Sequence, residues 1–162
     1  MNNFIIINLQ AIAGSIAIIL GFRWWIQPKV SKLSTYDALL PFVFLNMFRY
    51  LGLTFMAKEQ FYGGFPTEFI NTIGILDYTT AILAILAGIA LKGKWKSAIL
   101  LVWIFNIVGF GDLATAFPRF FILELYNYDL GFIWLMFITY GLAAFLSHFY
   151  IFYRLIKHWK KT

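Results

Sequence analysis

Long apolar segments alternate with short polar links along the whole chain. Five segments have about the 20 apolar residues that a helix needs to cross the hydrocarbon core of a bilayer. They span residues 4–25, 36–57, 69–91, 97–117 and 130–153. The links are too short to hold a separate water-soluble domain. The pattern therefore predicts an all-α fold, a single domain over residues 1–162, built as an integral membrane bundle of five transmembrane helices.

Proline and aromatic residues suggest how the links are built. We expect Pro28 to stop the first helix, since it has no backbone N–H and its ring clashes with the preceding turn. The second link covers residues 58–68. The fourth link, from Pro118 to Asp129, is amphipathic and aromatic. We expect it to lie on the membrane surface as a short helix.

Composition supports a lipid environment. Hydrophobic residues make up 62% of the chain and charged residues only 12%, whereas a soluble domain has about a quarter charged residues. The chain has no cysteine, which excludes disulfides and thiolate metal sites. It also lacks nucleotide-binding, serine hydrolase and zinc protease motifs. The sequence thus predicts no cofactor, and membrane lipids as the first partners.

The basic residues fall mostly on one side of a five-helix bundle. Ten of them would lie together: Arg23, Lys29, Lys32, Lys92, Lys94, Lys96, Arg154, Lys157, Lys160 and Lys161. The opposite side has only Lys58 and Arg119. Because basic residues collect on the cytoplasmic side, the amino terminus is expected outside and the carboxyl terminus in the cytoplasm. The net charge of +6 then indicates contact with anionic lipid heads and not with nucleic acid.

An 11-residue pattern occurs twice, 35 residues apart, in the third and fourth segments. The shared positions are Asn71, Gly74, Asp77, Thr80 and Ala81 in the first copy, and Asn106, Gly109, Asp112, Thr115 and Ala116 in the second. At 100° per residue, the Asn, Gly, Asp and Ala of each copy fall within about 120° of one helix face. An ionisable residue in a membrane segment is a functional candidate by default.

Depth counting brings the two aspartates together. The midpoint between Asp77 and Asp112 falls inside the short link that joins their antiparallel helices. Both carboxyl groups should therefore lie at one level. Arg49 lies about 18 Å from the start of the second helix, near the same level, with Asn46 one turn below it. We expect Arg49 to pair with a carboxylate, since a lone Arg at this depth costs at least about 2.5–3.5 kcal/mol.

One arginine and two aspartates leave one negative charge too many. Either one carboxyl group holds a proton, as like charges in one site tend to force, or a cation completes the cluster. The candidate ion or ligand site consists of Asp77, Asp112, Arg49, Asn46, Asn71, Asn106, Thr80 and Thr115. In this hypothesis the two Asp bind the proton or cation, and Asn71, Asn106, Thr80 and Thr115 supply supporting hydrogen bonds.

Four interpretations of this cluster stay open. The leading one is a small transport or channel-like protein, by analogy with the mid-membrane polar sites of transporters. Five helices enclose little volume, which favours a homo-oligomer. A second is a binding protein whose aromatic cavity holds a hydrophobic or lipid-like ligand, with an Asp pairing an amine. A third is a membrane enzyme that uses the two carboxylates as acid and base. The fourth is a static network that locks helices together.

His148 is expected near the cytoplasmic end of the last helix, as an interfacial residue. The chain shows no His pair, and no His with a carboxylate at helical spacing, as haem or di-metal sites would need.

The segment 41–116 resembles a set of uncharacterised bacterial multi-pass membrane proteins. The matching residues are Pro41, Asn46, Arg49, Gly52, Pro66, Gly74, Asp77, Asn106, Gly109, Asp112 and Ala116. The chain differs from the set at Asn46, where Gln is expected. The resemblance implies that these positions belong together, and it brings no activity. We accordingly expect a multi-pass protein of the bacterial inner (cytoplasmic) membrane.

Overall fold

Five long helical runs make up most of the described part of the chain. The computed structural model describes residues 2–57 and 65–160, and all regular structure in those two ranges is helical. The runs that are long and apolar enough to cross a membrane are Asn3–Val30, Thr35–Met56, Thr67–Lys92, Ala98–Ile122 and Phe132–Trp159. The five predicted helices are therefore confirmed as helices, with ends that differ by several residues.

The first run continues through the proline that was expected to end it. It consists of α1 (Asn3–Gly21), a π-helical turn (Phe22–Ile26) and α2 (Gln27–Val30). The prediction that Pro28 stops the helix is wrong. In the wider π turn the backbone N–H of Gln27 donates to the carbonyl of Phe22, five residues back. This local widening lets the helix accommodate a residue that has no N–H to donate.

The second run tightens half-way along its length. It starts as α3 (Thr35–Met47) and continues as a 3-10 helix (Phe48–Met56). The hydroxyl of Ser34 caps α3 by accepting from the backbone N–H of Asp37 at 3.2 Å. A 3-10 helix has three residues per turn, so residues three apart share a face. Arg49, Gly52 and Phe55 therefore point to the same side.

The third and fourth runs form an antiparallel hairpin. They are α4 (Thr67–Lys92) and α5 (Ala98–Ile122), joined by residues 93–97. Most of the predicted second link, residues 58–64, lies outside the described residues. The expected surface helix from Pro118 to Asp129 is wrong, because α5 continues to Ile122 and only a 3-10 turn (Leu125–Asn127) follows. Phe120 is buried in an aromatic cluster, and this packing extends the helix past its proline.

The last run extends further than expected. It consists of α6 (Phe132–Met136), a π-helical turn (Phe137–Gly141) and α7 (Leu142–Trp159). The predicted end at residue 153 left out the last turns. This difference places the residues around His148 close to the middle of the run and not near its end.

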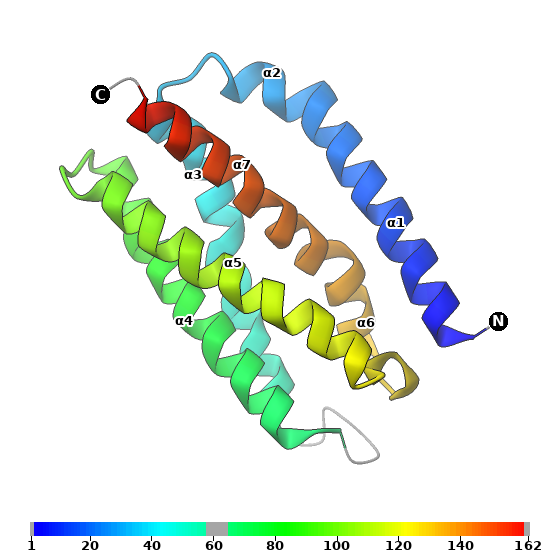
Figure 1. Cartoon of the computed structure of the whole chain (residues 1–162). Helices are drawn as coiled ribbons and strands as arrows, with labels where there is room; N and C mark the ends of the chain where they lie inside the picture. Colours follow the sequence, from blue (N-terminus) through cyan, green and yellow to red (C-terminus); the bar gives the residue numbers. More distant parts are fainter. Residues whose placement is uncertain (1, 58–64, 161–162) are drawn as a thin grey trace.

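The helices pack as a bundle with one peripheral member. The second run packs against α4, and α7 packs against α3 and α5. Figure 1 shows α1 at the outer edge beside α7, on the side away from α4. Only Ile7 of α1 is buried. The other four runs thus enclose the interior of the protein.

A polar layer separates two apolar clusters. One cluster includes Leu39, Phe105 and Ile151, and the other includes Phe69 and Phe120. Between them along the helices lie the buried polar residues Asn46, Arg49, Thr80, Asn106, Asp112, Ser147 and His148. Polar groups inside an apolar bundle need partners, and this layer contains the candidate site.

Candidate functional site

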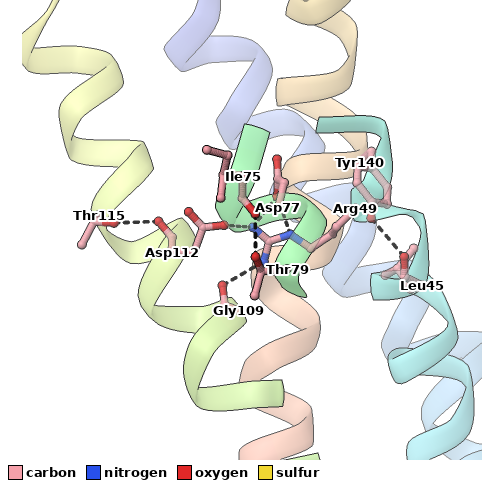
Figure 2. Close-up of polar contacts among 9 residues, drawn as sticks. All are labelled: Leu45, Arg49, Ile75, Asp77, Thr79, Gly109, Asp112, Thr115 and Tyr140. Atoms are coloured by element: carbon pink, nitrogen blue, oxygen red, sulfur yellow. Dashed lines mark hydrogen bonds and ion pairs between the residues drawn. The ribbon is translucent and has the colours of Figure 1, made fainter. Parts of the chain in front are cut away.

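A single arginine side chain occupies the centre of the polar layer. Arg49 is 1% exposed. Its Nε donates to Oδ1 of Asp77 at 2.6 Å, and its Nη1 donates to the carbonyl of Gly109 at 2.9 Å. Its Nη2 donates to Oδ2 of Asp112. Figure 2 shows the guanidinium between Asp77 on α4 and Asp112 on α5. Arg49 was expected to pair with a carboxylate, and the structure places its guanidinium against two.

The local backbone explains how Arg49 reaches both helices. The 3-10 helix puts Arg49 and Gly52 on the face that packs against α4. A Cβ at position 52 would overlap the carboxylate of Asp77. Only glycine therefore allows this close approach. The planar guanidinium then presents several N–H donors at fixed angles to acceptors on two helices.

The cluster has two carboxyl groups for one guanidinium. Two carboxylates share one guanidinium, and both are largely removed from solvent, with side chains 14% exposed for Asp77 and 3% for Asp112. With both carboxyl groups ionised, the net charge is minus one. A charge in an apolar interior is costly without a partner. The geometry therefore favours a proton on one carboxyl group or a cation beside it.

A second polar group joins α5 to α7. The Nδ1 of His148 lies 2.7 Å from Oδ1 of Asn106, and Nδ2 of Asn106 donates to the carbonyl of His148 at 3.4 Å. His148 is fully buried, so the expectation of an interfacial residue is wrong. The error follows from the end of α7, which lies at Trp159 and not near residue 153.

Asn46 holds the second run against α7. Its Nδ2 donates to the carbonyl of Phe42 at 2.8 Å and to Oγ of Ser147 at 2.9 Å. Nearby, the hydroxyl of Tyr140 donates to the carbonyl of Leu45 at 3.1 Å. Ser147, His148 and Tyr140 were not predicted for the site. The repeat gave no signal for them, because all three lie in the last run.

The comparison with protein families covers nearly the whole chain. The sequence pattern of a family described as a domain of unknown function, DUF8737, matches residues 6–156. This chain belongs to the DUF8737 family. No curated protein and no solved structure matches it. The match includes Arg49 and both copies of the repeat, so the whole cluster lies within the DUF8737 domain.

The two copies of the repeat in this DUF8737 chain differ in their surroundings. Asn106 is buried, whereas Asn71 is exposed. The hydroxyl of Thr115 donates to the backbone carbonyl of Asp112 at 2.9 Å and not to a carboxylate. Thr80 is buried, and its hydroxyl has no partner among the described residues. The copies are thus alike at the aspartates and unlike at the Asn and Thr that were expected to support them.

The carboxylate oxygens of the DUF8737 site are suited to accept a proton or to bind a singly charged cation. Within residues 2–57 and 65–160, no three His, Cys, Asp or Glu side chains are placed to hold a metal ion together. Oδ2 of Asp77 and Oδ1 of Asp112 have no hydrogen bond from the part of the chain that the structure describes. These free oxygens can accept a proton or an N–H donor.

Proposed function

We propose that the protein is a small membrane transport or channel-like protein that takes up a proton or a monovalent cation at the cluster of Arg49, Asp77 and Asp112. The observation that carries this proposal is the sharing of one buried guanidinium by two carboxylates. A cluster that only joined helices would be neutral with one carboxylate. The second carboxylate adds a charge that requires compensation in an apolar medium.

We also propose that the five helices cross the inner membrane of a bacterium, with the amino terminus outside. Their length and apolar character support this. Figure 1 shows the link between α2 and α3, the link between α4 and α5, and the end of α7 at one end of the bundle. Nine of the ten basic residues of the predicted cytoplasmic side belong to these links or to the helices beside them, and the tenth, Lys161, lies outside the described residues. Basic residues favour the cytoplasmic face.

Flux measurement tests the transport proposal. Wild type reconstituted in liposomes should dissipate an imposed proton or cation gradient. Asp77→Asn and Asp112→Asn should each lower the rate by about tenfold or more, which corresponds to about 1.4 kcal/mol or more in the barrier. Asp129→Asn is the matched control, because Asp129 is exposed outside the helices.

The outcomes separate transport from a purely structural role. A static helix lock would give no flux in wild type and a loss of stability in the variants. Equal flux in wild type, Asp77→Asn and Asp112→Asn would also contradict the proposal. Circular dichroism and gel filtration of each variant show whether the fold is retained.

A further inference from the structure

An apolar cavity lies directly beside the cluster. Its volume is about 80 Å³, several times the space that one water molecule needs. Lining residues recur at helical spacing on four of the runs. On α4 they are Phe69, Ile73 and Asp77, and on the 3-10 helix they are Arg49, Gly52 and Phe55. The cavity therefore extends along the bundle from the charged cluster toward the start of α4.

Only one of the two carboxylates faces this cavity. Asp77 lines it and Asp112 does not. Asp77 contacts Nε and Nη2 of Arg49 through Oδ1. The other oxygen, Oδ2, lies against Gly52, which also lines the cavity. Asp77 is thus placed to bind a ligand while it remains paired with Arg49.

The rest of the cavity wall is apolar and aromatic. Among the described residues of the lining, Tyr140 is the only further polar side chain, and its hydroxyl already donates to the carbonyl of Leu45. The ring of Phe137 contacts those of Phe117 and Phe120, and it is stacked on Phe120 at 4.3 Å between centroids. Aromatic faces attract organic cations. They do not replace the six or more oxygen ligands that Ca²⁺ prefers, or the octahedral shell of Mg²⁺.

We propose that the cavity binds a monovalent organic ammonium ion. Its N–H groups would donate to Oδ2 of Asp77, and its apolar body would lie among the phenylalanine rings. This inference rests on the proposed function in one respect, the surplus negative charge of the cluster. It adds the chemical class of the ligand and distinguishes the role of Asp77 from that of Asp112.

Titration with a matched set of small molecules tests the ligand class. Purified wild type in detergent should be stabilised saturably against heat by butylammonium, and not by butan-1-ol or butyrate at equal concentration. Asp77→Asn should weaken the binding of butylammonium by about tenfold or more. The variant loses the charge-assisted hydrogen bond between the carboxylate and the ammonium group. Equal binding of butylammonium and butan-1-ol would overturn the proposal.

A cavity-filling variant separates the ligand site from the charged cluster. Ala116 lines the cavity, so Ala116→Leu should abolish stabilisation by butylammonium while proton flux persists. Ala17→Leu is the matched control, because Ala17 is exposed on α1. Unchanged butylammonium binding in Ala116→Leu would place the ligand elsewhere and overturn the inference.

Two further comparisons show which of the two proposals a negative result rejects, and whether the ligand is a free amine or a lipid. Proton flux in wild type without butylammonium binding would reject the ligand class alone, and butylammonium binding without flux would reject transport alone. The same titration in nanodiscs with and without phosphatidylethanolamine distinguishes a free amine from a lipid headgroup. Competition by that lipid would identify the headgroup as the source of the ammonium.

Discussion

Arg49 is the residue on which the buried polar layer depends most. Its three guanidinium nitrogens donate to Asp77, Gly109 and Asp112 on two helices. Lysine would offer a point charge without the planar arrangement of donors. Removing the guanidinium leaves two buried carboxylates close together and unpaired. The energetic effect of Arg49 is therefore best measured with and without these carboxylates.

We predict that Arg49→Met lowers the free energy of unfolding by about 3–5 kcal/mol, the usual cost of removing one partner from a buried ion pair. The same change in a protein that already carries Asp77→Asn and Asp112→Asn should cost much less, because no charge is left unpaired. Unfolding in detergent, followed by circular dichroism, measures both. Equal costs in the two backgrounds would show that Arg49 acts through packing alone.

Arg119→Met provides the matched control for this comparison. Its side chain is 42% exposed and lies 3.8 Å from Glu68. An exposed pair of this kind contributes at most about 1 kcal/mol.

The sequence predicted the positions of some residues in the bundle better than those of others. The two aspartates were brought to one level by counting residues from a short link, where an error in a helix end has little effect. Arg49 was counted from the start of the second helix, which the structure places at Thr35, one residue from the predicted start. His148 was misplaced because its depth was counted from an end that lies further on, at Trp159. Asn71 and Asn106 share a sequence pattern, but only Asn106 meets another helix. Identical residues in the two copies do not determine which side of each helix packs against a neighbouring helix.

At the scale of elements, the 3-10 helix determines how closely the second run approaches α4. Its threefold spacing aligns Arg49, Gly52 and Phe55, and all three line the cavity. Apolar patterning could not predict this tightening, nor the π turns at Phe22–Ile26 and Phe137–Gly141. Membrane helices are apolar on most faces, so hydrophobic periodicity does not report their local winding. The presence of the five helices could be predicted from the length and composition of the apolar segments alone.

Gly52→Ala should destabilise the protein by about 1–3 kcal/mol, the usual cost of overpacking a well-packed interior. The added methyl group would overlap the Asp77 side chain. Gly111→Ala is the matched control, because a Cβ there meets nothing within 4 Å. It should stabilise α5 by up to about 1 kcal/mol. Thermal unfolding in detergent measures the pair, and equal effects would contradict the close approach.

At the scale of the whole molecule, the charges and the helix ends predict one orientation. The chain has no native cysteine, so single engineered thiols report their own positions. We expect Asn127→Cys to react with a membrane-impermeant maleimide in intact cells. Lys94→Cys, in the link between α4 and α5, should react only after permeabilisation. The reverse pattern of labelling would contradict the orientation proposed from the positive-inside rule.

Uptake of a proton or cation requires that the cluster of Arg49, Asp77 and Asp112, with both carboxyl groups ionised, has one negative charge more than its arginine can neutralise. With no suitable cation present, one proton should compensate that charge. Replacing either aspartate by asparagine leaves a single carboxylate paired with Arg49. Neither variant should then hold the proton.

Infrared spectroscopy of protein labelled with ¹³C-aspartate measures this most directly, in a buffer whose only cation is the bulky tetrabutylammonium ion. At neutral pH the wild type should show the C=O stretch of a protonated aspartic acid. The band should be absent from both Asp77→Asn and Asp112→Asn. A wild-type spectrum without the band, or a band that survives in either variant, would contradict the claim.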